Sequence, residues 1–172
     1  MIVNGYKIEP DSNLEEASLR CTDLSFANLS GASLKGSYLI RANLTEADLI
    51  GSNLEGANLR CANLIRSNLQ YSNLEGSDLT YSNLESSNLQ ESNIRRANLK
   101  GVNLEGANLT CSNLKYCNLE GANLRNANLN AANLEGTNLK RADLRGANLI
   151  DAYLKDANME DINLTNENPG KL

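Results

Sequence analysis

The side chains that could support chemistry in this 172-residue chain are four cysteines and a few pairs of adjacent acidic residues. The sequence contains no histidine, so neither a Cys–His pair nor a Ser–His–Asp triad can form. The cysteines form no CxxC pair, and without histidine they predict no zinc site, no other metal site and no cofactor. The glycines form no GxxxxGK phosphate loop. These residues therefore predict no catalytic site, and a protein that is not an enzyme.

A strict period of five residues organises the rest of the chain. Every fifth position from Leu14 to Leu164 is apolar, which makes 31 positions, of which 29 are Leu and two are Ile94 and Met159. A five-residue step rotates by about 140° on an α-helix, so these side chains would form no stripe there. On a straight β-strand the same step changes face each time. Three extended residues followed by a two-residue corner would instead point every Leu inward.

The other positions of the pentad agree with this geometry. Two residues before each central Leu there are 16 Ala, 10 Ser and 2 Thr, with larger side chains only at Val102, Cys117 and Ile162, as expected for a narrow inward site. Just before the centre there are 23 Asn and 4 Asp, which can bond the backbone near a turn and stack into ladders. The second position after the centre takes 10 of the 12 glycines, which indicates a tight corner.

Pentads such as Ala57-Asn58-Leu59-Arg60-Cys61 and Ala122-Asn123-Leu124-Arg125-Asn126 resemble the repeat of pentapeptide-repeat proteins. The resemblance covers residues 12–166. It implies an all-β fold, a right-handed quadrilateral parallel β-helix with four pentads per coil and about 7–8 coils. Residues 1–11, in which Ile2, Tyr6 and Ile8 share one parity before Pro10, are expected to form an N-terminal cap as a short strand or coil. Residues 167–172 form a short polar tail.

Four pentads per coil would place residues twenty apart in one column. Cys21 and Cys61 would then lie two coils apart, roughly 10 Å, whereas a disulfide needs Cα atoms within about 7 Å. Arg41, between them, could lower the pKa of a thiol, so a redox role stays open beside simple coincidence. Cys117 would be a small inward residue. The acidic pairs Glu15–Glu16 and Glu160–Asp161 would stand at convex corners, where no pocket raises their pKa values.

Two of the four expected faces differ in charge. The face whose centres run from Leu29 to Leu149 has no Lys or Arg and carries three acids, Asp48, Glu91 and Asp151. A second face, whose centres start at Leu19, is the most basic. It carries Arg20, Arg41, Arg60, Lys100, Lys140 and Arg141 against Asp78, Glu120, Glu160 and Asp161. Solvated surface is the simplest interpretation of both faces.

A protein-binding scaffold is the leading functional interpretation. The outward tyrosines and isoleucines are the candidate surface, because Tyr is enriched at interfaces, although scattered exposed apolar residues also need no explanation. These candidates are Tyr71, Tyr81, Tyr116, Ile50, Ile150, Tyr38 and Tyr153. The uninterrupted repeat is most similar to bacterial, especially cyanobacterial, members of the family, many of which have no known biochemical role.

The resemblance also implies an alternative, because some pentapeptide-repeat proteins mimic DNA and protect DNA gyrase from quinolones. DNA carries one charge per ~1.7 Å of its axis. A rod of about 7–8 coils, at roughly 4.8 Å per coil, would therefore match a length of DNA with on the order of 20 charges. The acidic face offers three. Gyrase-binding members also typically have a dimerising terminal helix and often a loop that interrupts the repeat, and neither is evident here.

Composition limits the expected partners and location. The net charge of −5, with 16 basic and 21 acidic residues interspersed, argues against a nucleic-acid partner. No stretch approaches 18 consecutive apolar residues, so no membrane span is expected. The first residues lack a signal-peptide pattern and the cysteines suit a reducing compartment, which together favour the cytoplasm. The expected partner is an unidentified protein, and the expected state is a monomer or an end-to-end homodimer.

Overall fold

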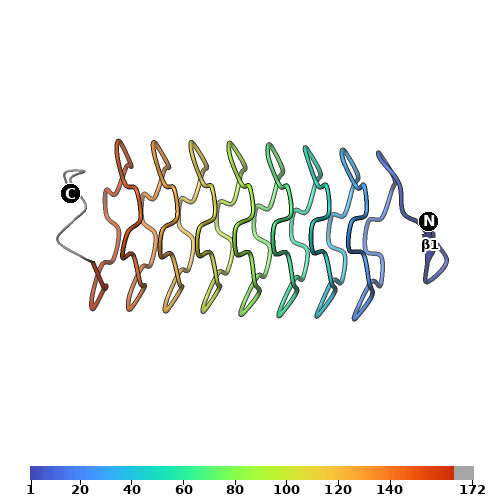
Figure 1. Ribbon diagram of the computed structural model, residues 1–172, viewed down its shortest axis with the longest axis horizontal. Helices are drawn as coiled ribbons and strands as arrows, with labels where there is room; N and C mark the ends of the chain where they lie inside the picture. The colour runs from blue at the N-terminus through green and yellow to red at the C-terminus, as the bar shows by residue number, and fades with distance from the viewer. Residues whose placement is uncertain (165–172) are drawn as a thin grey trace.

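The computed structural model describes residues 1–164, and these form a straight rod of stacked coils (Figure 1). The regular strands of this part of the chain are β1, Ile2–Val3, and β2, Tyr6–Lys7. The described residues contain no helix, and so none that could cross a membrane. The polar tail expected at residues 167–172 lies outside the described residues.

Successive coils are joined by parallel backbone pairing between residues twenty apart. The pairs run from Asn13 with Ser33 to Asp143 with Asn163. Around one such pair, the N–H of Leu54 donates to the carbonyl of Asn73 at 2.6 Å, and the N–H of Asn73 donates to the carbonyl of Ser52 at 2.9 Å. The step of twenty confirms four pentads per coil and the quadrilateral parallel β-helix.

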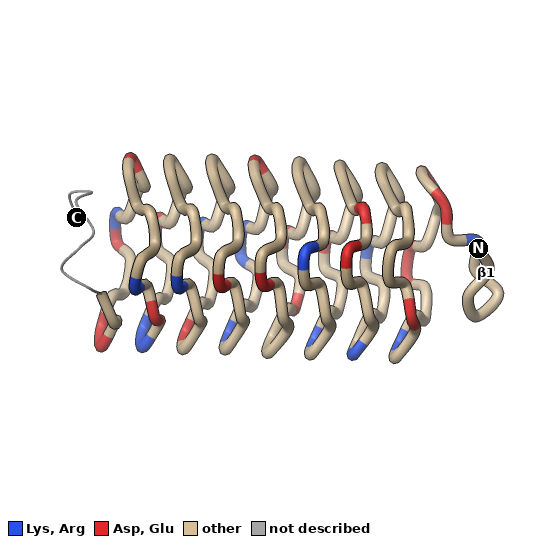
Figure 2. The backbone as a smooth tube through the Cα atoms, viewed as in Figure 1, with Lys and Arg blue, Asp and Glu red and all other residues tan. Residues whose placement is uncertain are grey.

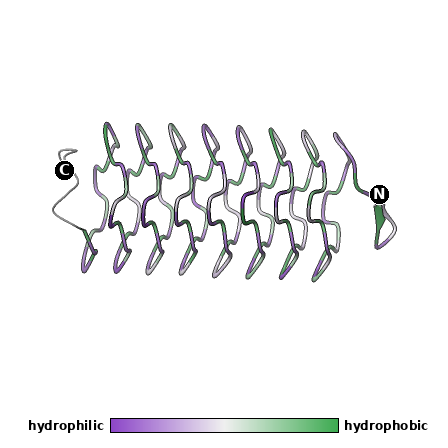
Figure 3. Cartoon of the chain, viewed as in Figure 1, coloured by the Kyte–Doolittle hydropathy of each residue, from purple (hydrophilic) through white to green (hydrophobic). Residues whose placement is uncertain are grey.

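The interior is a column of leucines surrounded by small side chains. Every central residue from Leu14 to Leu149 is buried, and so are the alanines and serines that precede them by two positions from Ala27 to Ala147. Figure 3 shows the resulting alternation of hydrophobic and hydrophilic stretches around each coil. In the last described coil, Leu154, Met159 and Leu164 are only partly buried. The inward assignment of the period is thereby confirmed.

Buried serines are satisfied by the turn that precedes them. The hydroxyl of Ser67 donates to the carbonyl of Leu64 at 2.8 Å, and Ser72 makes the same bond to Leu69 at 2.6 Å. Ser37 and Ser52 are equally buried, yet their hydroxyl oxygens have no hydrogen-bond partner among the described residues. Serines at the same inward position of different pentads thus differ in whether their hydroxyl group forms a hydrogen bond.

Every corner uses a left-handed backbone conformation. The second residue after each centre has positive φ from Glu16 to Asp161, and only ten of these thirty residues are glycine. The others have φ between 53° and 60°, which costs a non-glycine residue roughly 1–2 kcal/mol. Backbone bonds hold the corner in this shape, for example from the N–H of Ala62 to the carbonyl of Leu59 at 3.0 Å and from the N–H of Cys61 to the carbonyl of Thr80 at 3.0 Å. The geometry of the corner therefore does not depend on glycine.

The asparagine before each centre links both the turn and the next coil. Oδ1 of Asn53 accepts the N–H of Glu55 at 3.1 Å and the Nδ2 of Asn73, one coil further on, at 3.2 Å. The same bonds recur along the rod, as from Asn93 to Asn73 and from Asn113 to Asn93. The asparagine ladder expected from the sequence is confirmed.

A hairpin covers the first coil. Strands β1 and β2 pair antiparallel, and the turn between them has positive φ at both Asn4 and Gly5, as in a type I′ turn. Nδ2 of Asn4 donates to the carbonyl of Ser18 at 3.2 Å, and Ile8 is buried against the core. Residues 1–11 were expected to form one short strand or coil, and they form two strands instead because the Asn-Gly pair reverses the chain.

Candidate interaction surfaces

Corner residues of successive coils stack into four ridges along the rod. We call residues 30–31, 50–51, 70–71, 90–91, 110–111, 130–131 and 150–151 the cation-free ridge. Residues 20–21, 40–41, 60–61, 80–81, 100–101, 120–121, 140–141 and 160–161 form the arginine ridge. The two ridges are ten residues, or half a coil, apart, so they lie on opposite edges of the rod. Figure 2 shows acidic but no basic residues on its upper loops, and mostly basic residues on its lower loops.

A third ridge, which follows the centres from Leu14 to Leu154, uses its charges to connect coils. Arg95 pairs with Glu75 at 3.1 Å, and Lys115 pairs with Glu135 at 2.9 Å. The hydrogen bond between the latter two raises the pKa of Lys115 and lowers the pKa of Glu135. Both shifts favour the charged forms, as in a structural ion pair, so these charges are satisfied between coils of the rod.

The cation-free ridge presents apolar side chains that the rod itself does not use. Tyr71 is 54% exposed and Ile150 is 48% exposed, whereas Ile50 is half-buried. Among the described residues, no hydrogen bond, ion pair or ring contact involves the Tyr71 side chain. The acid Glu91 accepts a hydrogen bond from its neighbour Gln90 at 3.2 Å and forms no ion pair within residues 1–164. The described residues of this ridge form no ion pair, and its Tyr71 side chain is free to contact a partner.

Two of the candidate tyrosines instead cover glycines of the next coil. A Cβ added at Gly101 would collide with the ring of Tyr81, and one added at Gly136 would lie 2.6 Å from the ring of Tyr116. Tyr116 also donates a hydrogen bond to Glu135 at 3.3 Å. Each ring packs over the bare backbone one coil away, which gives both tyrosines a structural role.

The remaining candidates take asparagine positions in the ladder. Tyr38 pairs with Ser18 and Asn58 through its backbone, and the guanidinium of Arg20 lies 4.9 Å from the centre of its ring. Tyr153 pairs with Asn133 in the same way and is exposed. The structure therefore distributes the seven candidates over three sides: Ile50, Tyr71 and Ile150 on the cation-free ridge, Tyr38 and Tyr81 on the arginine side, and Tyr116 and Tyr153 on the third.

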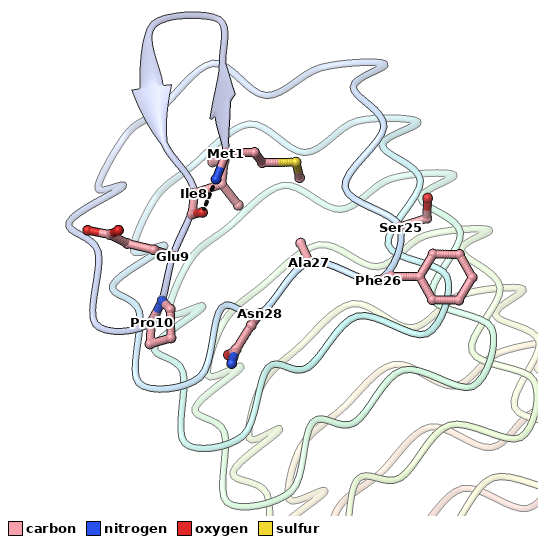
Figure 4. Close-up of a pocket in the computed structure, with 8 residues that line it drawn as sticks. All are labelled: Met1, Ile8, Glu9, Pro10, Ser25, Phe26, Ala27 and Asn28. Carbon is pink, nitrogen blue, oxygen red and sulfur yellow. Dashed lines mark hydrogen bonds between the residues drawn. The ribbon is translucent and has the colours of Figure 1, made fainter.

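A hollow of about 320 Å³ lies at the N-terminal end between the hairpin and a corner of the first coil (Figure 4). Met1, Ile8 and Phe26 line it with apolar surface, and Glu9 supplies a carboxylate. Phe26, 71% exposed, was not selected from the sequence. Its position at an outward corner was the available signal, but the hollow beside it depends on the fold of the hairpin.

The four cysteines are all free and lie apart. Cys21, Cys61 and Cys111 are exposed at corners, and Cys117 is buried. Burial raises the pKa of the Cys117 thiol to about 12, and its sulfur donates to the carbonyl of Ile94 at 2.9 Å. Within residues 1–164, no group of three or more Cys, Asp or Glu side chains is arranged to hold a metal ion.

The repeat also matches a known family directly. Segments described as pentapeptide repeats, eight copies in all, match residues 10–36, 22–60, 37–70, 57–96, 87–126 and 127–166. This chain belongs to the pentapeptide-repeat family. Its membership and the twenty-residue pairing together establish the right-handed quadrilateral β-helix. No curated protein matches the sequence.

Several solved pentapeptide-repeat structures are similar to this member of the family. A pentapeptide-repeat protein of Nostoc PCC 7120, alr5209, is 30% identical with a TM-score of 0.50, covering 60% of this chain and 84% of its own. HetL, involved in heterocyst differentiation regulation in Nostoc sp. strain PCC 7120, is 27% identical with a TM-score of 0.47, covering 90% and 87%. QnrB1, a plasmid-mediated fluoroquinolone resistance protein, is 18% identical with a TM-score of 0.65, covering 92% and 90%. The likeness to QnrB1 concerns the fold alone.

Proposed function

We propose that this pentapeptide-repeat protein is a non-enzymatic scaffold that binds another protein through its cation-free ridge. The observation that carries the proposal is the pair of exposed apolar residues, Tyr71 and Ile150, on a ridge with no internal ion pairs among the described residues. Tyrosine and aliphatic side chains at a protein surface become binding anchors when a partner desolvates them. Asp48, Glu91 and Asp151 at or beside the ridge would orient that partner.

The state of the reactive groups supports a role without catalysis. Perturbed pKa values often mark active sites, but here they belong to paired or buried groups. Asp143 has a lowered pKa because Arg145 bonds to it, and its Oδ1 lies 2.8 Å from the guanidinium Nε. Cys117 has a raised pKa because it is buried, which keeps the thiol protonated and unreactive.

A comparison of two double variants tests the ridge. The double variant Tyr71→Ser with Ile150→Ser removes the exposed apolar side chains of the cation-free ridge. The control double variant, Tyr81→Ser with Tyr116→Ser, removes two exposed tyrosines that lie on other ridges and cover glycines. Proteins captured from the source cells by the wild type should be lost with the first variant and kept by the second. If both variants capture the same partners as the wild type, the cation-free ridge is not the binding surface.

Gyrase protection is the alternative that the family resemblance implied, and the geometry does not favour it. The cation-free ridge and its flank carry three acids over the length of the rod. DNA of the same length carries on the order of 20 negative charges, so the rod does not match it. A supercoiling assay decides the question, since a large molar excess of this protein that neither inhibits gyrase nor protects it from a quinolone removes the alternative.

A further inference from the structure

Three arginines occupy successive coils at the N-terminal end of the arginine ridge. Arg20 and Arg60 are first corner residues and Arg41 is a second corner residue, and all three are exposed. At roughly 4.8 Å per coil, the three span about 10 Å along the ridge. Figure 2 shows this end of the lower loops as consecutive basic positions. From this cluster we infer a binding site for an acidic peptide segment of a partner protein.

Two of the three arginines of this cluster have no ion-pair partner in the described part of the rod. Further along the same ridge, Lys100 pairs with Glu120 at 3.2 Å, Lys140 with Glu160 at 2.8 Å, and Arg141 with Asp161 at 3.7 Å. Within residues 1–164, by contrast, Arg20 and Arg41 form no ion pair. Arg60 has only Asp78, at 3.8 Å. The ridge thus changes from self-paired charges to free cations at its N-terminal end.

Other cations without an ion pair do not form a comparable group. In the described part of the chain these are Arg96, Arg125 and Lys155. Arg125 lies on a different ridge from the other two, and Arg96 and Lys155 are three coils apart. Among the described residues, only Arg20 and Arg41 are cations without an ion pair that occupy one ridge in consecutive coils, and Arg60 extends this group by one coil with a single long pair to Asp78. The local excess of positive charge is notable in a chain with a net charge of −5.

The geometry of the cluster fits carboxylates on an extended peptide. Arginine binds a carboxylate through two parallel N–H groups, and stacking on a ring reduces the freedom that its side chain loses on binding. Arg20 is held in this way over Tyr38, at 4.9 Å. Acidic residues at alternate positions of an extended chain recur about every 6.4–6.8 Å on one side. Two or three of them would span the cluster.

The extent of the cluster favours a peptide over a nucleic acid. A nucleic-acid site usually requires a longer basic track, because each phosphate contact contributes a small, salt-sensitive part of the affinity. Here the track is interrupted by Asp78 after three coils. A short acidic segment needs no more than this length.

The test uses the full chain and a fluorescein-labelled ten-residue peptide of alternating Glu and Ser, followed by fluorescence anisotropy in low salt. The peptide should bind, and a Lys-Ser peptide should not. Arg41→Gln and Arg20→Gln should each weaken binding about three- to five-fold, the upper part of the range for an exposed ion pair. Raising the salt concentration to 0.2 M should weaken the binding of the acidic peptide to the wild-type protein. Arg141→Gln is the matched control, since Arg141 has the same corner position and is paired; it should leave affinity within about two-fold.

Three results would overturn the inference: no binding of the acidic peptide, equal losses for Arg41→Gln and Arg141→Gln, or tighter binding of a ten-nucleotide single-stranded DNA that is lost with Arg41→Gln. A second variant, Arg41→Gly, separates binding from folding, because its φ of 57° suits glycine. It should melt no lower than the wild type and still bind the peptide more weakly. Because Tyr71 and Ile150 lie on the opposite edge, the outcome is independent of the cation-free ridge.

Discussion

The interior and the corners of the rod obey opposite rules. In the interior, side-chain identity is fixed, with Leu at almost every centre and Ala or Ser two residues earlier, while backbone strain is absent. At the corners, the backbone is fixed in a left-handed conformation, while the side chain ranges from Gly101 to Phe26, Tyr71 and Arg41. The corners tolerate this variety because the hydrogen bonds that hold them use backbone atoms and the side chain of the preceding Asn, as from the N–H of Glu55 to Oδ1 of Asn53, rather than the second corner side chain. Variation in sequence is therefore concentrated where the backbone is least favourable.

The largest effect that this contrast predicts is the loss of stability caused by a charge in the interior. Leu104 is 1% exposed, so Leu104→Asp buries a carboxylate without a partner. We expect a loss of several kcal/mol, about 4 or more, because an unpaired buried charge costs more than the lost apolar contacts. Thermal unfolding followed by circular dichroism measures the loss. Glu105→Asp, at the adjacent corner, should change the melting temperature little, and an unchanged melt for Leu104→Asp would contradict the inward assignment.

A smaller effect separates two corners of one ridge. Gly101 and Gly121 follow each other on the arginine ridge, with φ of 64° and 66°. The ring of Tyr81 covers Gly101, whereas nothing lies within 4 Å of a Cβ at Gly121. Gly121→Ala should cost about 0.5 kcal/mol, which is the left-handed strain less the entropy that alanine removes from the unfolded chain, and Gly101→Ala about 1.5 kcal/mol, because it also displaces the ring. Denaturant titrations would show the difference, and it should vanish when Tyr81→Ala is present in both backgrounds.

The corners and the core could be predicted from the sequence because a five-residue period excludes the two regular alternatives, whereas the coil of four pentads followed from the resemblance to the family. The Asn53–Asn73 ladder followed from the same periodicity. The contacts of Tyr81 with Gly101 and of Tyr116 with Gly136 were also accessible, since each pair is twenty residues apart. An outward position alone does not indicate these contacts, because a ring at a corner can either face solvent or pack on the residue twenty positions away.

Other features depend on structure that the period does not determine. The hairpin arises from the local Asn4–Gly5 turn, which stands outside the repeat. The hollow beside Phe26 exists only because that hairpin packs across part of the first coil. The hydrogen-bonding state of Ser52 and Ser67 differs although both occupy the same pentad position, and the repeat pattern contains no signal that separates them.

That difference between serines predicts a gain in stability within the interior. Ser52→Ala removes a buried hydroxyl without a partner among the described residues, and should stabilise the protein by about 1 kcal/mol. Ser67→Ala is the control. It removes a satisfied hydroxyl whose acceptor, the carbonyl of Leu64, also accepts the N–H of Ser67 at 3.1 Å, so its effect should be near zero. Equal melting temperatures for the two variants would mean that both hydroxyls are equally satisfied.

The finest test makes one substitution at two adjacent residues. Ala131 is a corner residue with φ of 53°, and Ala132, the next residue, is an inward residue that is fully buried. Ala131→Gly relieves about 1 kcal/mol of left-handed strain and loses about half of that to the greater freedom of the unfolded chain, so it should stabilise the protein by about 0.5 kcal/mol. Ala132→Gly loses a buried methyl group as well as that entropy, so it should destabilise the protein by about 1–2 kcal/mol. Opposite shifts in urea midpoint at neighbouring positions would show that corner and interior are separate environments one residue apart, and shifts of the same sign would show that they are not.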